Sequence, residues 1–207
     1  MAAQKKKPVR RPGGPMPYRS VADFLFEAGL LKSVGRTGWD TVRAPYESVA
    51  EHSFRTAVVG WTLSRLSGLT QREESAVVKA CLFHDLHEAR IGDLHRMAKM
   101  YGKLDEKKVE ADQRQTLPSA LRDDLAAALD RLSPRLRQMV HEADKIECAI
   151  TAKEYLDAGY RTKKWIEHTR PRIKSAEGKA LLAAIEKTDS SDWFLGNRQW
   201  NRGRGSH

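Results

Sequence analysis

Cysteine and long apolar runs are the features that this sequence has least of. Only two cysteines occur among its 207 residues, which excludes a fold held together by several disulfides. No apolar run approaches the roughly 20 residues that a membrane-spanning helix needs, and the basic N-terminus lacks the apolar stretch of a secretory signal. Strand-like alternation of apolar and polar residues is absent, as are internal repeats. We therefore expect an all-α protein of the reducing cytoplasm with no membrane contact.

Positive charge is abundant, yet it is concentrated at the two ends of the chain. The formal net charge is +10. Residues 1–19 carry six Lys or Arg and no acid, residues 196–207 carry three Arg and no acid, and residues 20–195 hold 28 basic and 27 acidic side chains. We predict a disordered basic tail over residues 1–19, one domain over residues 20–195 and a C-terminal tail over residues 196–207. Only the tails would attract nucleic acid, and that contact would be nonspecific and salt-sensitive.

Apolar residues recur at helical spacing through most of the central region. The pattern predicts helices over residues 21–32, 47–67, 70–89, 119–132, 134–156 and 175–187. Ser20 is the expected cap of the first helix, Thr70 and Glu73 form the pattern of a capping box, and Gly92 should end the helix that follows. The helix over residues 47–67 has an apparent apolar stripe of Val49, His52, Phe54, Ala57, Val58, Trp61 and Leu63. Residues 95–117 are expected to form a solvent-facing loop and helix.

The stretch CLFHDLHEARIGDL, residues 81–94, places ionisable groups among apolar ones. His84 and Asp85 are adjacent, and Glu88 follows four and three residues later, so a helix would bring them to one face. Asp93 follows the predicted helix end, from which it could point back towards that face. Charged side chains are seldom buried unless they are paired or bind a metal. A divalent cation is the first candidate for a partner.

Two more polar residues fall on predicted buried faces of other helices, namely His52 and Asp144. Each has an ordinary interpretation, because a buried His is often satisfied by hydrogen bonds and Asp144 could pair with Lys145 or an Arg. Together with His84 and Asp85, however, they give two imidazoles and two carboxylates. Such a mixed set suits a divalent metal ion with open positions for water, with Mn, Co, Fe, Zn and Mg all acceptable.

Residues 33–48 break the helical period with two glycines and a proline, which predicts a long loop. Ordered loops of this length within a domain are often functional. Arg36 and Trp39 in it suit a phosphate group and a ring or sugar, respectively. The alternative is a Trp that fills a gap in the core beside a solvated Arg.

The spacing of these motifs along the chain is similar to that of a known protein family. The pattern H…HD…D on successive helices, with ESVAEHS before the first, HDxxExxxGDL at the centre and ADKxE later, resembles the HD-domain metal-dependent phosphohydrolases, in particular the branch with the 5'-deoxynucleotidases. The resemblance covers about Phe24 to Tyr155 and implies an all-α HD-domain helical bundle. By this resemblance the metal ligands are His52, His84, Asp85 and Asp144.

The same resemblance assigns roles to four other residues. It implies that Glu88 is a catalytic carboxylate, that Asp93 is a second catalytic or substrate-contacting acid, and that Arg36 and Trp39 bind the phosphate and sugar. The expected activity is metal-dependent hydrolysis of a nucleoside 5'-monophosphate, most often a deoxynucleotide, to nucleoside and phosphate. A deoxynucleoside triphosphate triphosphohydrolase and a noncatalytic nucleotide-binding protein are the alternatives.

A homodimer is expected from the resemblance and from the aromatic residues Trp193, Phe194 and Trp200. These side chains would tie the C-terminal segment onto the body of the protein or onto a second subunit.

Overall fold

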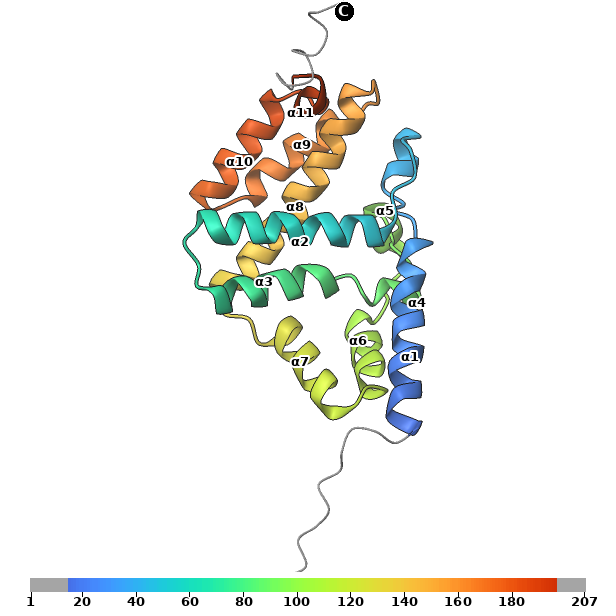
Figure 1. Cartoon of the computed structure of the whole chain (residues 1–207). Coiled ribbons are helices and arrows are strands. Elements are labelled where there is room, and N and C mark those ends of the chain that lie inside the picture. Colours follow the sequence, from blue (N-terminus) through green and yellow to red (C-terminus); the bar gives the residue numbers. More distant parts are fainter. Residues whose placement is uncertain (1–14, 197–207) are drawn as a thin grey trace, which may run out of the picture.

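Three long helices form the centre of the fold: α2 (Val49–Leu66), α3 (Gln71–Phe83) and α8 (Pro134–Asp157). In the computed structural model, which describes residues 15–196, α2 packs against both α3 and α8 (Figure 1). The main apolar core lies between these helices and includes Leu63 of α2, Val77 of α3 and Ile146 of α8. Burial of these apolar faces is the main force that holds the bundle together.

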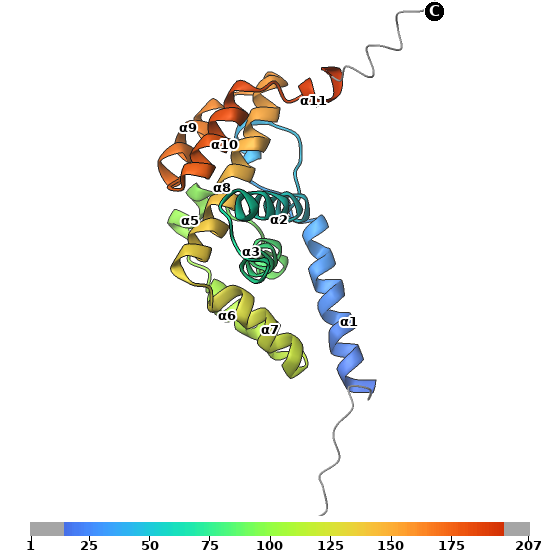
Figure 2. The same ribbon diagram turned by 60° about the vertical axis from the view of Figure 1, so that its left-hand side comes forward.

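The remaining helices lie around this centre. Their bounds are α1 (Pro15–Gly29), η1 (Leu30–Lys32), η2 (Trp39–Val42), α4 (Glu88–Ile91), α5 (Arg96–Tyr101), α6 (Glu106–Gln115), α7 (Ser119–Asp130), α9 (Lys163–Thr169), η3 (Arg170–Arg172), α10 (Ala176–Lys187) and α11 (Asp192–Leu195). Helices α9 and α10 pack on α8 at one end of the bundle, whereas α6 and α7 lie at the other end (Figures 1 and 2).

The all-α prediction is confirmed over residues 15–196. The only strand-like pairing in that range is one isolated antiparallel bridge between Gly35 and Ser48. No helix in the described part of the chain is long and apolar enough to span a bilayer. The predicted capping box at Thr70 and Glu73 is present, and Ser48 forms a second one with Glu51 at the start of α2.

Helix α1 begins earlier than the sequence predicts. It starts at Pro15, so Ser20 is an interior residue and not the cap, and residues 15–19 are helical although we assigned them to the tail. Proline is compatible with the first turn of a helix, where its missing N–H has no intrahelical partner to lose. Residues 1–14 and 197–207, which hold the rest of the two predicted tails, lie outside the described residues.

The predicted helix over residues 70–89 is correct as far as Phe83 and wrong over residues 84–87. Helix α3 ends at Phe83, a turn follows, and α4 begins at Glu88. The His84 ring donates from Nδ1 to the carbonyl of Cys81 at 2.7 Å, which is the carbonyl that a continuing helix would use for the next turn. The following backbone bonds run from residue i to i−3, as in Glu88 N to Asp85 O at 3.0 Å. This break changes the direction in which the acidic side chains point.

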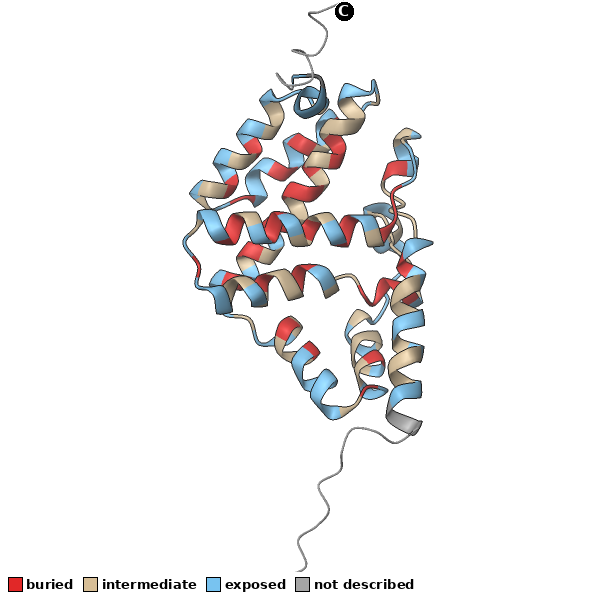
Figure 3. Cartoon of the chain, viewed as in Figure 1, coloured by how far each residue is buried: buried red, intermediate tan, exposed pale blue. Residues whose placement is uncertain are grey.

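The apolar stripe expected on α2 is correct for Val49, His52 and Leu63, which are buried, and wrong for three of its other apolar residues. Phe54, Val58 and Trp61 are 68%, 44% and 50% exposed, and the buried face is made largely of small and polar residues (Figure 3). The reason is the close approach of α2 to α3: a Cβ added at Gly60 would lie 2.7 Å from the Cys81 sulfur. Small side chains on this face therefore permit a packing that large apolar ones would prevent.

Candidate metal and phosphate site

His52 lies in the second turn of α2 with its side chain fully buried. Its Nδ1 contacts a carboxylate oxygen of Glu147, a buried residue of α8. When the proton of a neutral imidazole is on Nδ1, the lone pair is on Nε2. The Glu147 contact therefore directs Nε2 of His52 away from Glu147 and into the site, as outer carboxylates do for metal-bound histidines.

His84, in the turn after α3, is oriented in the same way by a different acceptor. Because its Nδ1 donates to the Cys81 carbonyl, its Nε2 faces His52, and the two Nε2 atoms are 3.3 Å apart. Two lone pairs at this distance repel each other unless a proton or a cation lies between them. Burial alone would lower the pKa of His84, but Asp85 raises it to about 9. The site thus stabilises a positive charge at its centre.

Two carboxylates complete the cluster around His52. Asp85 Oδ2 lies 3.5 Å from His52 Nε2 and 3.2 Å from His84 Nε2, and Asp144 Oδ1 lies 3.5 Å from His52 Nε2. Two ligands of one ion, each at about 2.1 Å from it, are separated by roughly 3.0–3.5 Å. The spacing and the nitrogen and oxygen donors therefore fit a divalent cation. The structure brings all four predicted ligands together.

The alternative interpretation of Asp144 is present as well, since Lys145 Nζ lies 2.7 Å from its other carboxylate oxygen. Burial alone would raise the pKa of Asp144, yet Lys145, His84 and His52 hold that pKa below its usual value. The carboxylate of Asp85 behaves likewise: burial opposes its charge, and the neighbouring His84, His52 and Arg36 hold its pKa far below the usual range. Both groups stay ionised, as metal ligands must.

Glu88 begins α4 and is buried, with 4% of its surface exposed. Its Oε2 has no hydrogen-bond partner in the part of the chain that the structure describes. Burial raises the pKa of this carboxyl to about 9, with further contributions from Asp85 and Asp93. Glu88 is thus a carboxyl group beside the cluster that retains its proton at neutral pH when no cation is bound.

Asp93 holds the loop over residues 33–48 against the segment that follows α4. Its carboxylate accepts the backbone N–H of Thr37 at 3.0 Å, and the Thr37 hydroxyl donates to the Asp93 carbonyl at 2.9 Å. Arg36 precedes Thr37, and its Nη1 lies 3.5 Å from Asp85 Oδ2. Burial opposes the charge of Arg36, but the neighbouring acidic groups, with Asp85 the largest contributor, together outweigh this effect and raise its pKa. The loop thus delivers a permanent cation to the metal-ligand cluster.

Trp39 has two roles in the structure. It is 3% exposed and belongs to the main core, and its Nε1 donates to Glu47 at 2.5 Å. Its ring also lies 5.6 Å from that of Trp165, with an angle of 32° between the planes. Trp39 therefore does fill a gap in the core, while its edge still lines the cavity described next.

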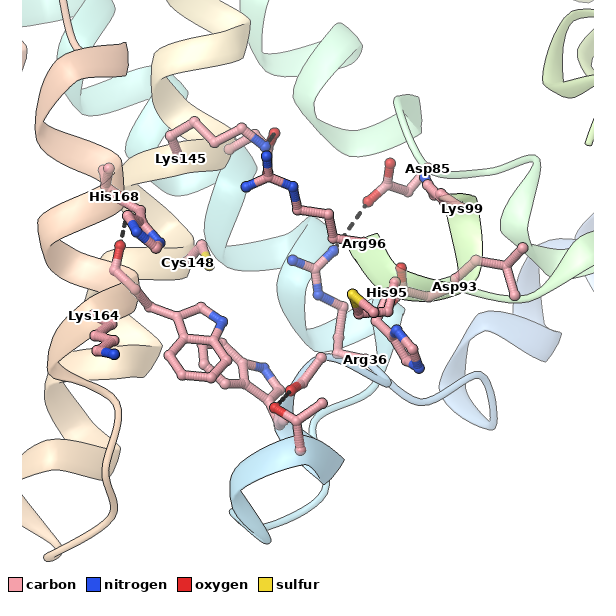
Figure 4. Close-up of a pocket in the computed structure, with 18 of the residues that line it drawn as sticks. Arg36, Asp85, Asp93, His95, Arg96, Lys99, Lys145, Cys148, Lys164 and His168 are labelled. Atoms are coloured by element: carbon pink, nitrogen blue, oxygen red, sulfur yellow. Dashed lines mark hydrogen bonds and ion pairs between the residues drawn. The ribbon is translucent and has the colours of Figure 1, made fainter. Parts of the chain in front are cut away.

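A cavity of about 660 Å³ opens onto the cluster. The turn after α3, the long loop, α5, α8 and α9 form its walls, and Figure 4 shows Arg36 and Asp85 joined at its inner end. The candidate residues that line it are Arg36, Trp39, Asp85, Glu88, Asp93 and Asp144. This volume falls in the range of small-molecule sites, about 300–1,000 Å³.

The sequence model of the HD domain family matches residues 28–179. The chain belongs to the HD domain family. Human 5'-deoxynucleotidase HDDC2 is 27% identical over 186 residues, which cover 84% of this chain and 88% of the human protein. A conserved hypothetical protein from Pyrococcus furiosus superposes with a TM-score of 0.63 at 27% identity, covering 81% of this chain and 99% of that protein.

A second solved structure supports the fold at lower identity. The HD phosphohydrolase DatZ of cyanophage S-2L, bound to dA and one catalytic Zn²⁺ ion, superposes with a TM-score of 0.55 at 20% identity. The match covers 79% of this chain and 96% of that protein. At this level of identity the likeness concerns the fold.

A buried polar network that the sequence motifs did not predict lies behind the candidate ligands. Arg55 Nε donates to Glu147 at 3.0 Å, and the Thr151 hydroxyl donates to Glu47 at 2.9 Å and lies 3.1 Å from Glu147. Glu47 in turn accepts from Trp39. Glu147 could have been found from its position, because it is an acidic residue on the same apolar stripe of α8 as Asp144.

Proposed function

We propose that the protein is a metal-dependent 5'-nucleotidase that hydrolyses (deoxy)nucleoside 5'-monophosphates to nucleoside and phosphate. The observation that carries the proposal is the convergence of His52 Nε2, His84 Nε2 and Asp85 Oδ2, at 3.2–3.5 Å from one another, with Asp144 Oδ1 3.5 Å from His52 Nε2. Asp85 and Asp144 of this group line the cavity, as does Arg36. Membership of the HD domain family and the relatives named 5'-deoxynucleotidase support the same activity.

In this proposal His52, His84, Asp85 and Asp144 hold a divalent ion. When bound, the ion supplies positive charge to the phosphoryl group and lowers the pKa of a water molecule. Arg36 adds a fixed charge to the phosphoryl oxygens beside it, where negative charge must be neutralised as the nucleophile approaches.

Glu88 is the proposed proton carrier. Its carboxyl lies beside Asp85 in the cavity wall, and one of its oxygens makes no hydrogen bond within residues 15–196. A bound cation would favour the ionised form that accepts a proton, and the raised pKa favours the protonated form that returns it. Asp93 keeps the loop that carries Arg36 in place, and Trp39 with Trp165 offers an aromatic surface to the sugar or base.

Phosphate release from a panel of ribo- and 2'-deoxynucleoside 5'-mono- and triphosphates tests the proposal. The full chain is chelated and reloaded with Mn, Co, Mg, Fe or Zn, and Asp85→Asn serves as the control. Release of phosphate from monophosphates that depends on the metal and is lost in Asp85→Asn supports the nucleotidase. Release of triphosphate from the longer substrates, or no product with any metal, overturns it.

We further propose a homodimer that uses the exposed apolar face of α2. Phe54, Val58 and Trp61 follow one another at helical spacing and remain 44–68% exposed, which is unusual for three large apolar residues on one face. The C-terminal aromatics offer weaker support, because Trp193 is 80% exposed and contacts Phe194, while Trp200 lies outside the described residues. Trp61→Arg should then yield monomers by light scattering, whereas an unchanged mass would exclude this face.

A cytoplasmic location is part of the proposal, since both cysteines are free thiols and suit a reducing compartment. The basic N-terminal tail would add nonspecific attraction to nucleic acid. Deletion of residues 1–14 should remove any such binding at low salt and leave nucleotide turnover intact.

A further inference from the structure

Some of the basic side chains that line the cavity pair with an acid, and others do not. Three of them are paired: Arg36 with Asp85, Lys145 with Asp144, and Lys99 with Glu106 outside the cavity lining. Three others have no acidic partner within salt-bridge distance in the described part of the chain, and these are Arg96, Lys164 and Arg172. A single phosphate at the metal cluster leaves their charge uncompensated.

Two of the unpaired cations lie on a wall of the cavity that carries no acid. This wall is formed by α9 and η3, where Lys164, His168 and Arg172 recur at a spacing of four residues. All four acidic residues of the lining lie outside α9 and η3, in or beside the metal cluster. Arg96 extends into the opening from α5, towards the side on which Lys145 and His168 lie (Figure 4).

The neighbouring indoles of Trp39 and Trp165, whose planes are tilted by 32°, line the cavity together with both groups. Aromatic faces of this kind bind a base or a sugar by stacking, which would leave one end of a nucleotide at the metal cluster and the other near α9. The cavity of about 660 Å³ is large enough for a whole nucleotide.

We propose that Arg96, Lys164 and Arg172 form a second phosphate subsite, so that the preferred substrates are nucleotides with two or more phosphate groups. This inference rests on the proposed function, because it places the first phosphate at the metal cluster. The second phosphate has two sources, a 3'-phosphate on the sugar or an extension of the 5' chain. Both present a phosphate group to Arg96, Lys164 and Arg172.

The test compares kcat/KM of the metal-loaded full chain for deoxyadenosine 5'-monophosphate, 3',5'-bisphosphate and 5'-triphosphate. The expected result is a higher kcat/KM for at least one of the longer substrates, arising from a lower KM and decreasing as salt is added. Preference for the bisphosphate identifies the 3' source, and preference for the triphosphate with phosphate as the product identifies the 5' chain. Release of triphosphate would overturn the proposed nucleotidase and, with it, the placement of the first phosphate on which the subsite rests. In Lys164→Gln/Arg172→Gln that preference should fall by about fivefold, the combined effect of two exposed ion contacts.

Lys163→Gln is the matched control. Lys163 is exposed on the same helix and pairs with Glu167 at 3.9 Å, outside the cavity. Lys163→Gln should keep the higher kcat/KM for the longer substrate. If it loses this preference as much as the double variant does, the effect is one of net charge and the subsite is overturned. Equal kcat/KM for all three substrates, or a preference that survives in the double variant, also overturns it.

The two proposals can fail separately. Turnover of the monophosphate without any preference for the longer substrates retains the nucleotidase and rejects the subsite. If no nucleotide is hydrolysed, isothermal titration calorimetry measures the affinity of the metal-loaded protein for the same three nucleotides and tests the subsite by binding alone. Tighter binding of the bisphosphate or triphosphate that is lost in the double variant supports the subsite, and equal affinities reject it.

Discussion

Glu147 holds the Nδ1 side of the His52 ring from across the bundle, and this contact between α8 and α2 determines which nitrogen of His52 faces the other candidate ligands. Both residues are fully buried. Burial alone would raise the pKa of Glu147, but His52 and Arg55 hold it below its usual value. An ionised carboxylate behind the imidazole raises the basicity of the ring and fixes its orientation.

Glu147→Gln should therefore weaken metal binding by about 10–100-fold, the usual effect of losing such an outer partner. The fold should persist, because the amide has the same shape and can still accept a hydrogen bond. Competition with a fluorescent chelator measures the affinity, and circular dichroism checks the fold. Glu154→Gln is the control, since Glu154 also pairs with Arg55, at 2.7 Å, but is exposed. Equal metal affinities for the two variants would show that Glu147 does not support metal binding through His52.

Glu88→Gln separates proton transfer from metal binding. If Glu88 carries a proton and does not hold the ion, turnover should fall by about 10²–10⁴-fold while metal stoichiometry remains that of the wild type. Steady-state kinetics and metal analysis of the same preparation measure the two quantities. Asp85→Asn is the contrasting variant and should lose both. Loss of the metal from Glu88→Gln would instead make Glu88 a ligand, a role that its proximity to Asp85 and His87 permits.

The candidate ligands could be predicted from the sequence because two of them are polar residues on apolar helix faces. His52 and Asp144 stand out by this criterion, and the adjacent His84 and Asp85 complete a spacing that identifies the family. The main helices could also be predicted, since the capping pattern of Thr70 and Glu73 is local and does not depend on tertiary packing.

What the sequence did not predict depends on contacts between distant residues. The break after Phe83 follows from the His84 ring bonding to the Cys81 carbonyl, a choice that helical periodicity does not reveal. The exposed stripe of α2 arises because Gly60 packs against Cys81, so the small residues are buried and the large ones are not. The sequence did not predict that Lys164, His168 and Arg172 line one cavity wall, because α9 is short and has no clear apolar period.

Gly92→Ala should destabilise the protein through its backbone alone. Gly92 has φ 74° and ψ 163°, a conformation that side chains disfavour, although no atom lies within 4 Å of the added Cβ. The expected cost is about 1–3 kcal/mol in the free energy of unfolding, measured by urea titration. Gly38→Ala is the control, since Gly38 has ordinary helical angles and equally open space, and it should be neutral or slightly stabilising. Equal effects of the two substitutions would exclude backbone strain at Gly92.

Glu142 offers a test of pH-dependent stability where α8 meets the start of α10. This buried residue of α8 accepts the backbone N–H groups of Lys174 at 2.7 Å and Ser175 at 2.9 Å, just before α10, and contacts the Ser175 hydroxyl. Burial alone would raise the pKa of Glu142, but these hydrogen bonds hold it below its ordinary value of 4.5. The ionised carboxylate thus anchors the start of α10 to the core of the bundle.

The direction of the pH effect follows from the lowered pKa. A carboxyl whose pKa is lower in the folded state contributes stability above pH 4.5, and that contribution is lost as the pH falls through the folded-state pKa. Glu142→Gln should therefore unfold about 1–3 kcal/mol more easily at pH 7, and the difference from the wild type should shrink in acid. Urea titrations between pH 3 and pH 7 measure both values. Glu106→Gln, which removes an exposed partner of Lys99, should change stability by less than about 0.5 kcal/mol at every pH. A difference at Glu142 that stays constant down to pH 3 would mean that its charge is not what anchors α10.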